Sequence, residues 1–201
     1  AEGCVGMPTL IGHAIRRSLA GLEWAAGIPG TVAGCVVMNA GTRLGEMKDS
    51  VKAVRIVSPK GALMDCSAEA IEFGYRRATL PLGVVVGVWL QLRSGVRADI
   101  EKVVKEYLHY RRDTQPLTLP SAGSVFKHPL NDLAGRVVEA TGFKGTAVGD
   151  AQVSMKHANF IVNQGQASAS DVLSLIKKIR TGIVRKTGIK LELELKIVGE
   201  V

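Results

Sequence analysis

A serine and a histidine that could do chemistry together lie in the segment PSAGSVFKHP at 120–129, at Ser124 and His128. A histidine base can activate a serine hydroxyl for nucleophilic attack. The sharp turn that presents a hydrolase serine has the pattern Gly-x-Ser-x-Gly, however, and Val125 and Phe126 depart from it. The segment also contains no carboxylate that could orient the histidine. From these residues alone, a serine that caps a turn is the simpler interpretation.

Charged residues in two further segments are also open to more than one interpretation. Arg76 is half of a basic pair in FGYRRA at 73–78, which fits an exposed doublet or a guanidinium that clasps a carboxylate through two hydrogen bonds. Glu192 and Glu194 alternate with leucines in KLELELK, so on a strand they share the face opposite the leucines. That face is either a solvated edge or part of a site.

The stretch GLEWAAGIPGTVAGCVVMNAG at 21–41 is rich in glycine, which lets backbone approach a ligand closely. Pro29 forces Ile28 out of helical space, so Gly27 to Gly30 is predicted to form a shaped turn. Thr31 is predicted to cap a short helix whose first free amides would point at an anion. The stretch matches neither a Walker A loop nor Gly-x-Gly-x-x-Gly, so a structural turn and a phosphate or cofactor cradle both remain open.

Periodicity and capping residues predict a mixed helix and strand chain. The predicted helices and strands are a helix over 8–20, a hairpin of 51–58 with 62–66, a buried strand over 84–92, an amphipathic helix over 99–112, a helix capped by Asn131 and Asp132 and ending at Gly142, a strand over 159–163, a helix opened by Ser170 and Asp171 and ended by Gly188, and a strand over 191–197.

Composition narrows the classes of function. No apolar run is long enough to span a membrane, and the three cysteines and four histidines show no metal-ligand spacing, so we expect no metal site and a cytoplasmic protein. The net charge of +8 indicates an acidic partner. The basic pairs are scattered and only 4% of residues are aromatic, which favours a nucleotide-sugar over nucleic acid. Oligomeric state is not indicated.

The glycine-rich stretch resembles the flavin-binding signature of the UDP-N-acetylenolpyruvoylglucosamine reductase family. FGYRRA, PSAGSVFKHP and KHANFIVNQGQASASDVLSLI at 156–176 resemble later motifs of that family in the same order, so the resemblance covers nearly the whole chain. The family's first flavin-binding segment, with its Gly-Ser-Asn loop, is expected before residue 1. The implied fold is α+β, with the C-terminal part of an FAD-binding domain at 1–96 and a smaller substrate-binding domain at 97–201 that begins with a linker helix at 99–112.

The resemblance also implies site residues. Ser124 matches the serine that protonates the substrate, Arg76 the cation beside the substrate carboxylate or enolate, and Glu194 the catalytic glutamate, although Leu193 stands where proline is usual. Lys127 and His128 match substrate-binding positions, and His128 replaces the usual asparagine. The implied FAD contacts are Gly27, Ile28, Pro29, Gly30, Thr31, Gly34, Asn39 and Gly41.

The implied activity is that of an NADPH-dependent flavoprotein reductase, which converts UDP-N-acetylenolpyruvoylglucosamine to UDP-N-acetylmuramate in peptidoglycan precursor synthesis. The chain opens on Ala1 rather than Met, which fits a fragment, and we expect weak FAD retention without the preceding segment. The alternatives are an inactive nucleotide-sugar binding module of the same fold, a nucleic-acid-binding protein, and another enzyme of the same flavin-binding class.

Overall fold

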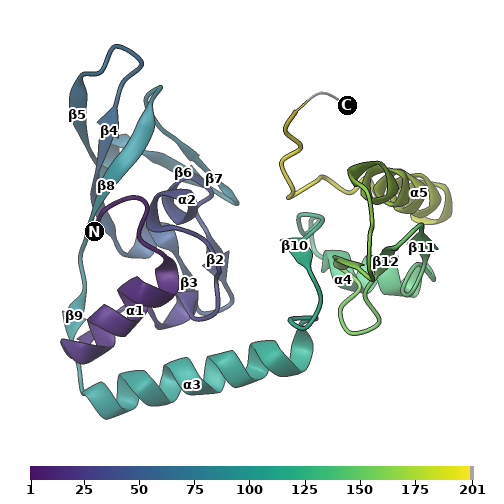
Figure 1. Cartoon of the computed structure of the whole chain (residues 1–201), viewed down its shortest axis with the longest axis horizontal. Coiled ribbons are helices and arrows are strands. Elements are labelled where there is room, and N and C mark those ends of the chain that lie inside the picture. The colour runs from purple at the N-terminus through teal and green to yellow at the C-terminus, as the bar shows by residue number, and fades with distance from the viewer. Residues whose placement is uncertain (200–201) are drawn as a thin grey trace. The chain divides into compact units, whose positions relative to one another are not determined.

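The computed structural model describes residues 1–199, which divide into two compact units (Figure 1), and the boundary along the chain falls between Arg111 and Arg112. The first unit runs from Ala1 to Arg111 and the second begins at Arg112. Each unit mixes helices with antiparallel strands, as the α+β prediction requires. No helix among residues 1–199 combines the length and the apolar character that a bilayer crossing needs.

The first unit is built on an antiparallel sheet of order β5–β4–β8. The predicted hairpin is confirmed as β4 (Val51–Val57) and β5 (Leu63–Ser67), closed by a turn in which the Gly61 N–H donates to the Ser58 carbonyl. β8 (Val84–Leu90) pairs with the other side of β4. Residues 1–3 lie along the free edge of β8, where the Gly3 N–H donates to the Val86 carbonyl at 2.8 Å.

Shorter elements complete this unit. The helices are α1 (Met7–Arg16), α2 (Val32–Val37) and α3 (Arg97–Thr114), whose last three residues belong to the second unit, and 3-10 turns occur at Glu23–Ala25, Met47–Asp49 and Ala68–Ala70. Three two-stranded pairs join β1 (Leu19–Ala20) to β9 (Arg93–Ser94), β2 (Gly41–Thr42) to β3 (Gly45–Glu46), and β6 (Glu72–Gly74) to β7 (Arg77–Thr79). The predicted helix over 8–20 therefore ends early, because the chain turns at Ser18, which has a positive φ of 55°.

The strand predicted over 84–92 exists, but the expectation that it is buried on both faces is wrong. Val85 and Val88 are buried against α2 and the core, whereas Val84 is 66% and Trp89 42% exposed. An antiparallel sheet commonly packs one face on the core and leaves the other to solvent. The run of β-branched residues predicted the strand correctly and its burial incorrectly.

The structure groups most of α3 with the first unit, whereas the sequence prediction placed this helix at the start of the second domain. Val104 and Tyr107 are buried in the core of the first unit, while Val103 and Leu108 of the predicted apolar face stay about 40% exposed. The helix is bound to the first unit because its buried stripe completes that core.

The second unit contains a four-stranded antiparallel sheet of order β10–β13–β12–β11 and two helices (Figure 1). Its core gathers Phe126, Val138 and Ile161 against the inward face of α5. The elements are β10 (Ser121–Ser124), α4 (Ala134–Ala140), β11 (Ala147–Val148), β12 (Ala151–Val153), β13 (Phe160–Asn163) and α5 (Ala169–Thr187).

The ends of the helices in this unit depart in detail from the prediction. Ser168, rather than Ser170, caps α5, and it forms a capping box with Asp171. Gly188 ends α5 with a φ of 74°, as predicted. The N-cap of α4 is Leu133, which has no side-chain cap, so the prediction that Asn131 and Asp132 cap this helix is wrong.

The last predicted strand, over 191–197, does not form. This segment makes an isolated bridge between Leu193 and Phe126, although Leu191 is buried and Leu193 and Leu195 pack against the core. The alternation of leucine and charge therefore correctly indicates a segment with one buried side. The segment is not a strand, because it pairs with a neighbouring segment at a single bridge.

Candidate functional site

The loop from Gly27 to Thr31 is a shaped turn, as its proline and glycines predict. Gly27 has a φ of +80°, a conformation that favours glycine, and a Cβ atom built on it would lie 2.9 Å from Nε of Arg111. Within residues 1–199 the backbone N–H groups of Gly27, Gly30 and Thr31 form no hydrogen bond. The loop therefore leaves three backbone donors available for a ligand.

The short helix after this loop does not present its first amides to an anion, so that part of the prediction is wrong. Thr31 caps α2 as expected, because its hydroxyl accepts the Gly34 N–H at 3.2 Å. The Val32 N–H donates to the Val5 carbonyl and the Ala33 N–H to the Gly3 carbonyl, at 2.8 and 2.9 Å. The N-terminal segment of the chain has taken these donors, so the free ones lie in the preceding loop.

The far end of the glycine-rich stretch is held by Asn39, which is fully buried. Its side-chain amide donates to Glu46 at 2.8 Å and to the Gly74 carbonyl at 3.1 Å, and its oxygen accepts the Lys48 N–H at 3.0 Å. This residue therefore links the stretch to β3 and β6. Because its side chain has these three partners within the protein, a ligand would contact Asn39 through its backbone.

Arg76 lies beside the end of the same stretch. Its Nη1 atom is 3.1 Å from the position that a Cβ would take on Gly41, and its guanidinium stacks over Tyr75 at 4.8 Å. Arg76 also has a φ of 57°, which non-glycine residues seldom adopt. Backbone strain of this kind is concentrated at functional sites. The structure thus brings a predicted catalytic residue next to a predicted cofactor-binding residue within the first unit.

Ser124 and Glu194, predicted from distant parts of the chain, lie on neighbouring segments of the second unit. Ser124 ends β10 and is opposite Phe160 of β13, and the Glu194 N–H donates to the carbonyl of the next residue, Val125, at 2.9 Å. Ser124 is half-buried, and its hydroxyl has no hydrogen-bond partner within the described residues. A hydroxyl that acts as a proton donor must be able to contact the substrate, so it should not already be hydrogen-bonded within the protein.

Lys127 and His128 follow on the same segment and have different surroundings. Nζ of Lys127 lies 3.5 Å from Oε2 of Glu192, and the Lys127 N–H donates to the Glu192 carbonyl. Nδ1 of His128 accepts the Ala134 N–H at 3.2 Å, so this ring serves as an acceptor at the start of α4. The histidine that replaces the family's usual asparagine therefore supports the fold of the segment.

Asn159 is a residue of this site to which the sequence analysis assigned no role. It is fully buried, its oxygen accepts the Phe126 N–H at 3.0 Å and its amide donates to the Phe126 carbonyl at 2.8 Å. Its own carbonyl accepts the Val125 N–H. Asn159 thereby fixes the backbone that follows Ser124, and its place inside the motif KHANFIVNQG is the sequence signal that could have identified it.

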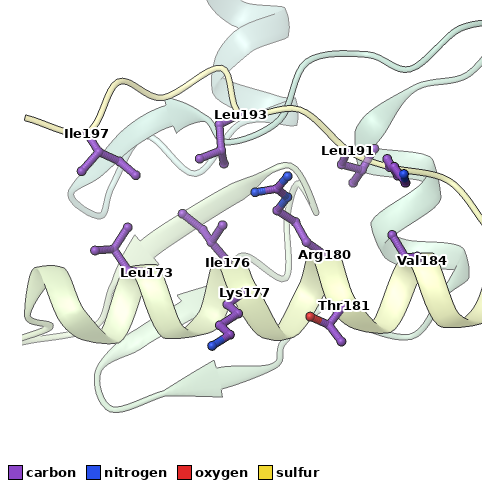
Figure 2. A pocket seen from close by; sticks show the side chains of 10 residues that line it. Leu173, Ile176, Lys177, Arg180, Thr181, Val184, Leu191, Leu193 and Ile197 are labelled. Carbon is purple, nitrogen blue, oxygen red and sulfur yellow. The ribbon is translucent and has the colours of Figure 1, made fainter. Parts of the chain in front are cut away.

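None of the predicted catalytic, cofactor-binding or substrate-binding residues lines either of two well-formed surface hollows in the part of the chain that the structure describes. One, of about 530 Å³, lies between α5 and the C-terminal segment, and Figure 2 shows Ile176 and Arg180 on the side of α5 that faces Leu193. The other, of about 650 Å³, is lined by Trp24 and Asp49 among others. No group of His, Cys, Asp and Glu side chains within residues 1–199 is arranged to hold a metal ion.

Two family models match the chain. A model described as UDP-N-acetylenolpyruvoylglucosamine reductase, C-terminal domain, matches residues 115–198. A model described as FAD binding domain matches residues 3–67. The first match includes the segment of Ser124 and Glu194, and the second includes the glycine-rich stretch.

Relatives match along almost the entire chain. UDP-N-acetylenolpyruvoylglucosamine reductase 2 of Symbiobacterium thermophilum is 47% identical over 199 residues, which are 98% of this chain and 64% of that protein. The reductase of Synechococcus elongatus is 42% identical, over 100% of this chain and 69% of that protein. The crystal structure of UDP-N-acetylenolpyruvylglucosamine reductase from Thermus caldophilus superposes with a TM-score of 0.86 at 42% identity, over 95% of this chain and 69% of that one. The chain thus spans about two thirds of the length of these relatives, and it belongs to the UDP-N-acetylenolpyruvoylglucosamine reductase family.

Proposed function

We propose that the protein carrying this chain is an FAD-dependent, NADPH-oxidising reductase that converts UDP-N-acetylenolpyruvoylglucosamine to UDP-N-acetylmuramate. The observation that carries the proposal is the placement of Ser124 and Glu194 on hydrogen-bonded segments of one unit, at the positions that match the family's proton donor and glutamate. We place the reaction in the cytoplasm, where peptidoglycan precursors are made.

The residues of the glycine-rich loop fit a cofactor with a phosphate group. The amides of Gly27, Gly30 and Thr31 are free among residues 1–199, and Nε of Arg111, which packs on Gly27, is buried without a partner. Bound FAD would take hydride from NADPH and deliver it to the enolpyruvyl group. We assign residues 1–96, together with the part of α3 that packs on them, to cofactor binding and the second unit to substrate binding.

In this proposal the chain supplies the proton and the charge stabilisation. The Ser124 hydroxyl gives its proton to the substrate carbon that bears the carboxylate, after hydride has reached the neighbouring carbon. Arg76 and Glu194 stabilise the enolate-like charge that develops on the substrate between these two steps. Their contribution is electrostatic, and a planar guanidinium suits a carboxylate because it binds both oxygens.

Lys127 and His128 are proposed to contact the UDP-sugar, whose pyrophosphate and carboxylate are anionic. The net charge of +8 favours such a ligand. Because Nδ1 of His128 already accepts a backbone N–H, only its other ring nitrogen is proposed for the substrate. Lys127 reaches the substrate by exchanging its exposed contact with Glu192.

An anaerobic half-reaction experiment tests the proposal on the protein at its full natural length. NADPH is expected to bleach the flavin absorbance, and UDP-N-acetylenolpyruvoylglucosamine is expected to restore it with formation of UDP-N-acetylmuramate. A protein that binds the UDP-sugar but shows no flavin-dependent turnover would be a nucleotide-sugar binding module instead, and the reductase proposal would be wrong.

A further inference from the structure

Arg111, near the end of α3, is a cation held against the glycine-rich loop. A Cβ built on Gly27 would lie 2.9 Å from its Nε and 3.0 Å from its Cδ, so glycine at residue 27 lets the side chain pack closely on the loop. The same Cβ would lie 3.2 Å from Cδ2 of Leu108, one turn earlier on the helix. Arg111 and Leu108 therefore both pack against the backbone of Gly27.

Among residues 1–199, the Arg111 side chain has no partner of opposite charge. Its Nε is buried without a hydrogen bond, and within residues 1–199 the side chain forms no ion pair. A buried polar group without a partner is costly, and a charged one more so. In a protein interior such a group usually has a ligand or partner that satisfies it.

The surroundings of Arg111 fit a phosphate. The loop on which it packs carries the three free amides, those of Gly27, Gly30 and Thr31. Adjacent backbone N–H groups in a turn, here those of Gly30 and Thr31, form a typical phosphate-binding arrangement together with a guanidinium. These donors come from the loop and from α3, and the amides of α2 do not contribute because other backbone groups occupy them.

We propose that Arg111 binds a phosphate group of the nucleotide ligand that the Gly27–Thr31 loop receives. In the reductase proposed above, on which this assignment of the ligand rests, that group is the pyrophosphate of FAD. NADPH and the UDP-sugar carry the same chemistry, so the three sources must be distinguished by experiment.

The test uses the protein at its full natural length and three variants, Arg111→Gln, Arg111→Lys and Lys105→Gln. Lys105 is an exposed cation on the same helix, so Lys105→Gln makes the same change in charge away from the loop. Calorimetry measures binding of FAD, riboflavin, NADPH, a UDP-sugar and inorganic pyrophosphate. Riboflavin is the important control, because it carries the isoalloxazine ring without any phosphate.

Arg111→Gln is expected to weaken FAD and pyrophosphate binding by about 10- to 100-fold, the usual effect of losing a charge-assisted hydrogen bond, and to leave riboflavin binding unchanged. Arg111→Lys is expected to restore part of the loss, and Lys105→Gln is expected to change nothing. A loss confined to NADPH or to the UDP-sugar would keep the phosphate site and assign it to that ligand, overturning the FAD assignment.

Either of two results with Arg111→Gln would overturn the inference. If Arg111→Gln bound all the phosphate-bearing ligands as well as wild type, the residue would have no binding role. If it lost riboflavin and FAD equally, its role would be structural. Failure of the reductase proposal can be told apart from failure of the Arg111 inference. If wild-type protein bound pyrophosphate through Arg111 but never bound FAD, the phosphate site would stand and the reductase proposal would be wrong. A wild-type protein that bound none of these ligands would refute both.

Discussion

The backbone N–H of Glu194 donates a 2.9 Å hydrogen bond to the carbonyl oxygen of Val125. This bond joins the C-terminal segment to the residue that follows Ser124, so two proposed catalytic residues are fixed to one another by backbone. Asn159 holds the same segment from the other side through Phe126. These hydrogen bonds therefore fix the backbones of Ser124 and Glu194 relative to one another.

Replacing Ser124 by alanine is expected to separate the two half-reactions. Flavin reduction by NADPH should persist, since it needs no proton from Ser124, whereas turnover of the UDP-sugar should fall by about 10²- to 10⁴-fold. Stopped-flow absorbance measures the two steps separately. Ser121→Ala, on the same strand, is the control and should retain turnover; equal losses in both variants would show damage to β10 and not to catalysis.

Substitutions at Arg76 are expected to reveal its strained backbone as well as its role. Arg76→Gly and Arg76→Ala both remove the guanidinium, but only alanine keeps a Cβ at a φ of 57°. The glycine variant should therefore be more stable than the alanine variant, by about 1 kcal/mol, and neither should turn over the UDP-sugar. Thermal unfolding and steady-state assays measure the two effects.

Arg77 is the matched control for Arg76, because it lies in β7, where glycine costs about 0.5–1 kcal/mol relative to alanine. Here the order of stabilities should reverse, with Arg77→Ala more stable than Arg77→Gly, and turnover should persist. The same order at both positions would contradict the left-handed backbone at Arg76.

His157 is expected to make stability depend on pH. Burial lowers its pKa below the ordinary value of 6.5, and the charges of His128 and Lys144 act in the same direction, opposed by a hydrogen bond to the backbone of His157 itself and by the charge of Glu139. The unfolded chain therefore takes up this proton more readily than the folded chain. The free energy of unfolding should be highest above pH 6.5 and should fall as the pH drops from there toward the folded-state pKa.

Urea unfolding between about pH 8 and pH 5 measures this dependence. His157→Gln should flatten the pH profile relative to wild type, whereas His13→Gln, at an exposed position of α1, should leave it unchanged. A wild-type profile that is the same as that of His157→Gln would show that His157 does not couple to folding.

The start of α5 distinguishes two serines. The Ser168 hydroxyl accepts the Asp171 N–H at 3.1 Å, and the Asp171 carboxylate accepts the Ser168 N–H at 2.8 Å. The hydrogen bonds that the carboxylate accepts from the backbone and the hydroxyl of Ser168 lower the pKa of Asp171. Ser168→Ala should therefore cost about 1 kcal/mol of stability. Ser170→Ala, inside the helix, should have little effect. Denaturant unfolding of the two variants measures the difference, and equal stabilities would refute the cap.

Some elements could be predicted because their signals are local. The hairpin of β4 and β5 follows from alternation and a Pro-Lys-Gly turn, and the end of α5 follows from Gly188. The burial of Val84 and the membership of α3 could not be predicted, because they depend on which surfaces other elements cover. The segment 191–197 shows the same limit: its alternation is real, but a strand also requires a neighbour along its length.

The sequence by itself determined the motifs, the family they resemble and the residue types at 76, 124 and 194, since these depend only on order and chemistry along the chain. Tertiary structure decided which donors are free. The amides of α2 looked available in the sequence, yet Gly3 and Val5 fold back and occupy them, while Arg111 comes from a distant helix to rest on Gly27. A backbone N–H that donates to a remote carbonyl is no longer available to a ligand, and a linear sequence does not show which of these hydrogen bonds form.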